Sequence, residues 1–218
     1  LEVKFGEKRD DKDPSPKYPP ISLLGGKVKL SGVIDRIDVS DDYCRIIDYK
    51  TGGVDASPAA LFTGNKLQLY LYASAVNDKK TAGAYYVKIK DEYSEEDAKA
   101  TPLAAGVTLN DENLVLLQDE HFATEDKSEF IPVKKKNDRF NNLTSKENLE
   151  NLKKYALILA ENAAKEMMEG VIIPSPFKNA CEYCQFSAVC GKAENSERTV
   201  RSVTEDCVAE SARGYGEK

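Results

Sequence analysis

Residues 27–53 read KVKLSGVIDRIDVSDDYCRIIDYKTGG, and this stretch decides the fold. Two runs rich in Val, Ile and Tyr, at 28–39 and 43–49, lie on either side of a polar Ser-Asp-Asp corner at 40–42 and are expected to be the strands of a β-hairpin. If the corner closes as a two-residue loop, counting inward along both strands places Asp35 directly opposite Asp48. The sequence therefore predicts a hairpin with two opposed carboxylates.

Because side chains alternate along a strand, Asp35, Asp48 and Lys50 are expected to share one face of the hairpin. The other members of that face are apolar: Val33, Ile37, Val39, Cys44 and Ile46. Opposed carboxylates repel, and an unpaired buried charge costs several kcal/mol. A divalent cation would remove both problems, and oxygen ligands of this kind suit Mg²⁺ or Mn²⁺.

A solvated surface hairpin is the alternative, because an acid two residues before a lysine recurs elsewhere in this chain, as in Asp97-Ala98-Lys99. Asp48-Tyr49-Lys50 differs because apolar strand residues surround it and a second Asp lies at the pairing distance. Asp38, on the other face, is expected to form an ordinary cross-strand ion pair with Arg45.

The 218 residues, 41% of them hydrophobic, suit one α/β domain with an insertion, or at most two small domains. No run approaches the roughly 20 apolar residues of a membrane span, and no signal-peptide pattern is found. The net charge of −6 argues against a free-standing, sequence-independent DNA-binding protein. The chain begins inside an expected strand at Leu1, which suggests a fragment of a longer protein.

After the hairpin, residues 57–76 have helical patterning, which Thr63-Gly64-Asn65 is expected to divide into a short and a longer helix. Residues 82–89, AGAYYVKI, are expected to form another strand. Gln68 and Tyr72 are four residues apart in the longer helix, so they share a face. Spacing alone equally fits a half-buried tyrosine beside a surface glutamine.

Residues 91–142 are polar and irregular and are expected to form an insertion or lid, with a weak helix at 112–119 and a short strand at 130–133. The insertion contains the one basic cluster, Lys134, Lys135, Lys136 and Arg139, for which a solvated loop is favoured over phosphate contact. Thr144 and Glu147 form a capping box that predicts a long helix to Glu169. Residues 192–218 are expected to be a loosely ordered polar tail.

The chain has five cysteines, and three of them form the run Cys181-x₂-Cys184-x₅-Cys190. Disulfide pairing explains an odd, clustered set poorly, so metal or iron–sulfur ligation in a reducing cytoplasm is favoured. Cys44 and Cys207 are expected to be plain thiols.

The ordered series GVID (32–35), DYKTG (48–52) and QLYLY (68–72) resembles the RecB-like branch of the PD-(D/E)xK nuclease superfamily. The resemblance implies an α/β, restriction-endonuclease-like core, in which a mixed central sheet is flanked by helices. It also implies that Asp35, Asp48 and the Tyr49 carbonyl hold Mg²⁺ or Mn²⁺ and that Lys50 is catalytic. Gln68 and Tyr72 then orient Lys50 or grip the substrate backbone.

The similarity extends over about residues 1–191, from FG at 5–6 to CEYCQFSAVC at 181–190, and is strongest to the nuclease domain of AddB-type subunits of ATP-dependent helicase–nucleases. It implies a cytoplasmic DNA exonuclease for double-strand break repair and recombination, with an AddA-type partner. No Walker A motif occurs, so an ATPase must come from elsewhere.

The same resemblance implies that Cys181, Cys184 and Cys190 join a fourth cysteine to hold a [4Fe–4S] cluster. No cysteine precedes Cys44, so the fourth ligand is expected outside these residues, and zinc or free thiols stay open. The only histidine, His121, does not match the upstream active-site histidine of many RecB-like nucleases. Two other functions also stay open: an inactive DNA-binding scaffold module, and a stand-alone RecB-like nuclease of the CRISPR-adaptation type.

Overall fold

The computed structural model describes most of the chain, namely residues 2–8, 10, 15–89, 104–125, 128, 130–137, 139–177, 180–182, 184–186, 189–190 and 203–213. The strands are β1 (Val3–Phe5), β2 (Ile21–Leu23), β3 (Val28–Leu30), β4 (Gly32–Ile34), β5 (Arg36–Ser40), β6 (Tyr43–Lys50), β7 (Lys80–Lys88), β8 (Ala104–Thr108), β9 (Lys134–Lys136) and β10 (Arg139–Asn141). The α-helices are α1 (Pro58–Phe62), α2 (Gln68–Ala75), α3 (Glu112–Gln118), α4 (Lys146–Met168) and α5 (Glu205–Arg213), and the 3₁₀ turns are η1 (Leu24–Gly26) and η3 (Glu120–Ala123).

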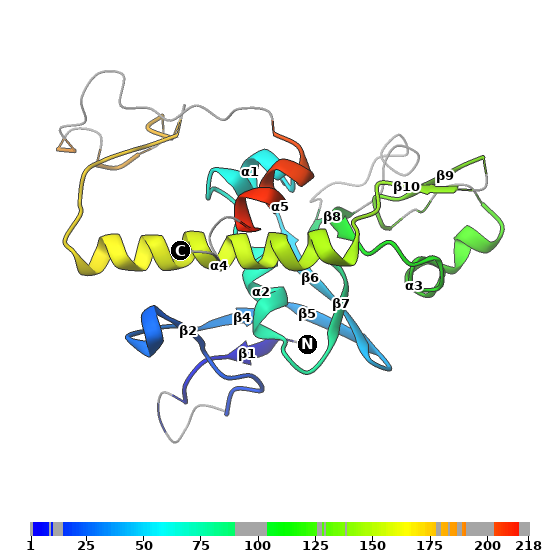
Figure 1. Ribbon diagram of the computed structural model, residues 1–218, viewed down its shortest axis with the longest axis horizontal. Coiled ribbons are helices and arrows are strands. Elements are labelled where there is room, and N and C mark those ends of the chain that lie inside the picture. The colour runs from blue at the N-terminus through cyan, green and yellow to red at the C-terminus, as the bar shows by residue number, and fades with distance from the viewer. Residues whose placement is uncertain are drawn as a thin grey trace.

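The central sheet has four strands in the order β5-β6-β7-β8. β6 pairs with β5 antiparallel and with β7 parallel, and β7 pairs with β8 antiparallel. Parallel neighbours need a crossover connection, which α1 and α2 provide between β6 and β7. The α/β fold with a mixed central sheet flanked by helices, predicted from the sequence, is confirmed (Figure 1).

The β5–β6 hairpin has the predicted register, from Ser40 opposite Tyr43 to Arg36 opposite Ile47. The ladder ends one pair short of Asp35 and Asp48, because the chain bends at Asp35. The expected continuous strand over 28–39 is wrong. It is divided into β3, β4 and β5, which pair with β2, β1 and β6 respectively.

The bend also shifts the alternation of side chains. Ile34 is fully buried, whereas Val33 is 36% exposed and Val39 is 51% exposed. The expectation that Val33 belongs to the apolar face is therefore wrong, whereas Val39 keeps its expected place opposite Cys44 and is exposed near the end of β5. Asp38 does pair with Arg45 across the hairpin, at 2.7 Å.

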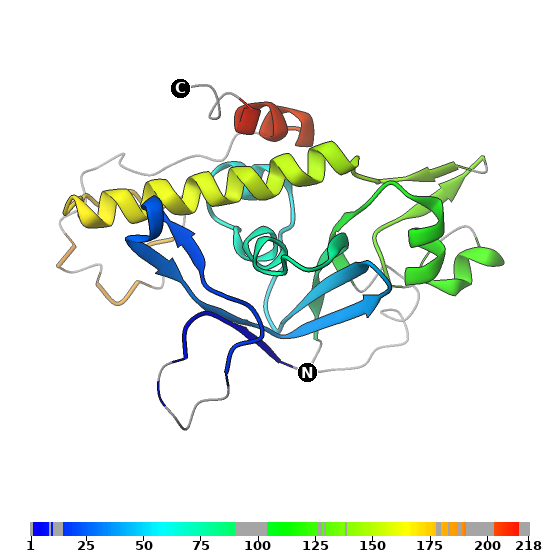
Figure 2. The same ribbon diagram turned by 60° about the horizontal axis from the view of Figure 1, so that its bottom comes forward.

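Two apolar clusters hold the sheet between its covering layers. On one face, Ile46 and Ala84 pack in a cluster with residues of α2 and α4. On the other face, Ile47 and Tyr85 pack in a cluster with Val115 of α3 and with the segment that leads into β9. Figure 2 shows α4 lying along the first face, with α5 above it.

Part of the expected insertion belongs to the core. β8 lies inside 91–142, yet it forms the fourth strand of the central sheet. Its sequence, AAGVT, is rich in Ala and Gly, which are depleted in strands, so composition does not reveal it. The helix expected at 112–119 is confirmed as α3. The strand expected at 130–133 is wrong, because pairing begins only at Lys134, after Pro132, which has no N–H to donate.

The long helix is confirmed, but its N-cap is Ser145, whose side chain accepts from the backbone N–H of Asn148. The predicted cap, Thr144, instead donates its hydroxyl to Glu205 of α5 at 2.9 Å. Part of the tail is also ordered, since α5 packs on α4 and buries Val208, Ala209 and Ala212. Among the helices of the described residues, none is long and apolar enough to span a membrane.

Candidate active site

Asp48 lies near the end of β6 and is 1% exposed. Its Oδ2 atom forms an ion pair with Nζ of Lys50, two residues further along the same strand. That buried Oδ2 atom has no hydrogen bond of good geometry. Burial raises the pKa of Asp48, the contact with Lys50 lowers it and the negative charge of Asp35 raises it, so the pKa ends above its usual range.

Asp35 occupies the bend between β4 and β5 and is half-buried. Its Oδ2 atom accepts a hydrogen bond from the backbone N–H of Tyr49 at 2.9 Å, which fixes the carboxylate against the end of β6. Since the charge of Asp35 raises the pKa of Asp48, the two carboxylates lie within electrostatic reach of each other. The bend therefore brings together the two acids that strand pairing was expected to oppose.

A chain of hydrogen bonds leads from Lys50 into α2. Nζ of Lys50 donates to Oε1 of Gln68 at 2.9 Å, and Nε2 of Gln68 donates to the hydroxyl of Tyr72 at 2.8 Å. Because α2 begins at Gln68, these two side chains are one helical turn apart on one face. Burial raises the pKa of Tyr72, as do the charges of Asp48 and Asp35. All five side chains named from the sequence thus meet at one place.

Tyr86 of β7 also belongs to this site, and the sequence did not reveal it. The parallel register places it beside Asp48, and Nζ of Lys50 lies 5.5 Å from the centre of its ring. Burial and the charge of Asp48 raise the pKa of Tyr86 to about 12. Lys66, in the loop before α2, is a further positive charge that lowers the pKa of Asp48. The strand register reveals Tyr86 and the course of the loop before α2 reveals Lys66, so the local sequence indicates neither residue.

Gly32 and Phe5 pack next to Tyr72. A β-carbon on Gly32 would lie 2.7 Å from Cε1 of Phe5, so only glycine permits this close approach. The Phe5 ring packs edge-on against Tyr72, with ring centres 5.9 Å apart. In the sequence, the dipeptide FG at 5–6 and the glycine of GVID are the two features that indicate this contact. Both are recognised only through the family resemblance.

The donor set fits a divalent cation of the Mg²⁺ type. Two carboxylates converge, and one of them has a buried oxygen that lacks a well-formed hydrogen bond. Within the described part of the chain, no group of three or more His, Cys, Asp or Glu residues is arranged to hold a metal ion. Further ligands would be backbone carbonyls such as that of Tyr49, together with water.

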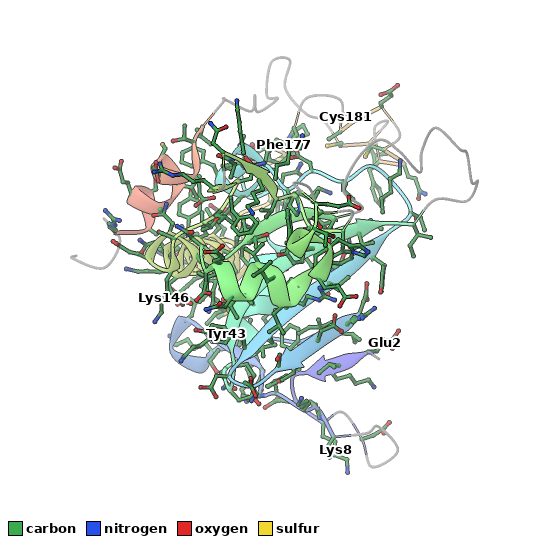
Figure 3. All side chains as sticks on the ribbon, turned by 90° about the vertical axis from the view of Figure 1, so that its right-hand side faces the viewer. Glu2, Lys8, Tyr43, Lys146, Phe177 and Cys181 are labelled. Carbon is green, nitrogen blue, oxygen red and sulfur yellow. The ribbon has the colours of Figure 1, made fainter. Side chains whose placement is uncertain are left out.

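The cysteines do not form a metal site within the described residues. Cys181 and Cys184 lie in a turn, in which the N–H of Cys184 donates to the carbonyl of Cys181 at 3.3 Å, and Cys190 is exposed. Figure 3 shows Cys181 at the margin of the molecule, opposite Lys8. The three cysteines form no disulfide in the described part of the chain, and a [4Fe–4S] cluster stays a prediction.

The two remaining cysteines and the histidine lie outside the site. Cys44 is buried in β6, and burial raises the pKa of its thiol to about 11. Cys207 is exposed on α5. His121 is exposed in η3, where its Nδ1 atom lies 2.9 Å from Oδ1 of Asp119.

Residues 1–191 match the PD-(D/E)XK nuclease superfamily, and the chain belongs to it. It is similar to proteins named as B-type subunits of an ATP-dependent helicase/deoxyribonuclease. The identity is 31% to that of Clostridium kluyveri, 30% to that of Desulforudis audaxviator and 32% to that of Clostridium novyi.

These three alignments cover 87%, 94% and 93% of this chain, but only 19%, 20% and 21% of the respective relatives. The chain therefore corresponds to about a fifth of each relative.

Proposed function

We propose that this chain is a Mg²⁺-dependent deoxyribonuclease domain, an exonuclease that hydrolyses DNA phosphodiester bonds within a helicase–nuclease. The observation that carries the proposal is the convergence of Asp35, Asp48 and Lys50 at the end of β6. These three residues do not serve stability alone, because their arrangement is unfavourable without a ligand. The two acids repel each other, and one buried carboxylate oxygen lacks a well-formed hydrogen bond.

Asp35, Asp48 and the Tyr49 carbonyl are the proposed metal ligands. A bound Mg²⁺ would supply Lewis acidity and lower the pKa of water at the site. The protein's part is to hold the carboxylates in place: the N–H of Tyr49 fixes Asp35, and the sheet fixes Asp48. Such preorganisation is what lets charged groups stabilise developing charge without rearranging.

Lys50 is the proposed catalytic cation, which positions water or stabilises the negative charge that develops on the phosphate. Gln68 holds its Nζ atom in place, and the face of Tyr86 lies beside it. Tyr72 fixes the amide of Gln68 in turn. Gln68 and Tyr72 therefore act chiefly as positioning residues for Lys50, and this is their proposed role.

The wider setting is also a proposal. The relatives' names suggest a helicase partner. The AddA type of that partner, a role in repair and recombination of broken DNA, and a cytoplasmic location are proposed from the family resemblance of the sequence. Strand separation would come from such a partner, since this sequence has no Walker A motif. A [4Fe–4S] site completed by a cysteine outside residues 1–218 stays a prediction. No reaction step is assigned to it.

The direct test compares cleavage of labelled single-stranded DNA by the wild-type chain and by Lys50→Met, with Mg²⁺ and with EDTA. The expected result is Mg²⁺-dependent cleavage that Lys50→Met loses, because the charge at the reacting phosphate is gone. The matched control is Lys80→Met, at the opposite end of the neighbouring strand β7. Cleavage that persists in EDTA, or that survives Lys50→Met, would rule out the proposal. A wild-type chain that binds DNA without cleaving it would favour the scaffold function.

A further inference from the structure

The hairpin of β9 and β10 carries a cationic face that the active site does not use. Its register pairs Lys134 with Asn141, Lys135 with Phe140 and Lys136 with Arg139. The hairpin projects beyond α3 and β8 at one end of the molecule (Figures 1 and 2). The hairpin is strongly basic, although the chain as a whole has a net charge of −6.

The pleat separates two kinds of residue. Lys134, Lys136, Arg139 and Asn141 share one face, and all four are exposed. Phe140 lies on the other face, where its ring packs edge-on against Phe122 with ring centres 5.1 Å apart. This contact fastens the hairpin to the second apolar cluster and holds the cationic face outward.

The cations on this face are placed in a way that lowers stability. Lys136 and Arg139 are direct cross-strand partners, and like charges in that position are destabilising. Lys134 is only two residues from Lys136, about 7 Å along the strand, which is within the Debye length at physiological salt. Among the ion pairs found in the described residues, none involves Lys134, Lys136 or Arg139. The sequence has one acid between Lys136 and Arg139, namely Asp138, which is not among the described residues.

A rigid row of repelling cations is stabilised by an anion with regularly spaced charges. We infer that the exposed face formed by Lys134, Lys136, Arg139 and Asn141 binds phosphates of a DNA strand at a distance from the scissile bond. Lysine, arginine and asparagine side chains are common donors to phosphate oxygens, and such contacts position a strand without reading its sequence. This inference rests on the proposed function for its choice of polyanion.

The test measures binding of a fluorescein-labelled oligothymidylate by fluorescence anisotropy in EDTA, across a range of salt concentrations. The variant combines Lys134→Gln, Lys136→Gln and Arg139→Gln in the full chain. Single-stranded DNA loses about 0.7 in salt slope for each phosphate contact removed, so the slope is expected to fall by about 2. Affinity at moderate salt is expected to fall by about tenfold or more.

The control removes the same charge elsewhere, by Lys146→Gln, Lys154→Gln and Lys165→Gln on the exposed side of α4. It is expected to keep the wild-type slope. An equal loss in both variants would overturn the inference, because net charge alone would then explain it, and so would an unchanged hairpin variant. If the triple variant fails to fold, Lys136→Gln alone is expected to lower the slope by about 0.7.

The two proposals fail separately. A wild-type chain that binds the oligonucleotide with the steeper slope but does not cleave it in Mg²⁺ contradicts the nuclease proposal and leaves the hairpin assignment standing. Mg²⁺-dependent cleavage together with undiminished binding by the hairpin variant contradicts only the hairpin assignment.

Discussion

Nζ of Lys50, at the end of β6, lies 2.9 Å from Oε1 of Gln68, the first residue of α2. This hydrogen bond joins the strand that carries Asp48 to the second helix of the crossover connection. The amide of Gln68 is fixed from its other side by the hydroxyl of Tyr72. The position of the lysine thus depends on the packing of α2 against the sheet.

Gln68→Met is expected to reduce kcat for single-stranded DNA by about 10²-fold, because Lys50 loses the bond that positions it. Tyr72→Phe is expected to have a smaller effect, since the bond between Lys50 and Gln68 remains. Steady-state kinetics in Mg²⁺ measures both. A larger loss of kcat for Tyr72→Phe than for Gln68→Met would contradict the conclusion that Gln68 positions Lys50 directly and Tyr72 does so through Gln68.

Asp35→Asn is expected to abolish cleavage and yet leave the free energy of unfolding in EDTA unchanged or slightly raised. The amide oxygen can still accept from the N–H of Tyr49, while the repulsion between Asp35 and Asp48 disappears. Thermal unfolding with EDTA and with Mn²⁺ tests this. Bound metal should raise the Tm of the wild type and not that of the variant. A loss of several kcal/mol in EDTA would contradict the account of this pair.

Gly32→Ala is expected to lower the free energy of unfolding by about 1–3 kcal/mol, the usual range for overpacking. The new β-carbon would meet the Phe5 ring at 2.7 Å and so displace the support of Tyr72. Gly53→Ala is the matched control, because nothing lies within 4 Å of a β-carbon there. Equal stability of the two variants, measured by urea unfolding, would show that position 32 tolerates a β-carbon next to Phe5.

Cys44 is expected to resist iodoacetamide at pH 8, while Cys207 reacts readily. The thiolate is the reactive form, and burial raises the pKa of Cys44 to about 11, so the thiol stays protonated until the pH approaches that value. Cys207 is exposed on α5 and serves as the internal standard. Mass spectrometry of tryptic peptides gives the two rates. Comparable rates would mean that β6 is not buried as described.

The sequence predicted the hairpin register because a two-residue polar corner between alternating strands leaves one way to pair them, with Ser40 opposite Tyr43. It did not predict the bend at Asp35, because GVIDRID reads as continuous strand and only pairing with β1 divides it. Tyr86 was missed for a related reason: the register of parallel strands depends on a crossover that local sequence does not specify.

Segments with few large apolar residues were the other source of error. β8 consists mainly of Ala and Gly, and it is a strand because β7 offers it an edge. α5 buries only Val208, Ala209 and Ala212, so its composition resembles a polar tail. In both, tertiary contact decides the structure, and in β8 it does so against the low strand propensity of Ala and Gly.

The most direct test of the central claim is the anomalous difference density of crystals soaked with Mn²⁺. A peak between the carboxylates of Asp35 and Asp48, absent from crystals of Asp48→Asn, is the predicted result. The account is contradicted if the soaked chain cleaves DNA in Mn²⁺ while its crystals show no peak at this pair, or show the metal bound elsewhere.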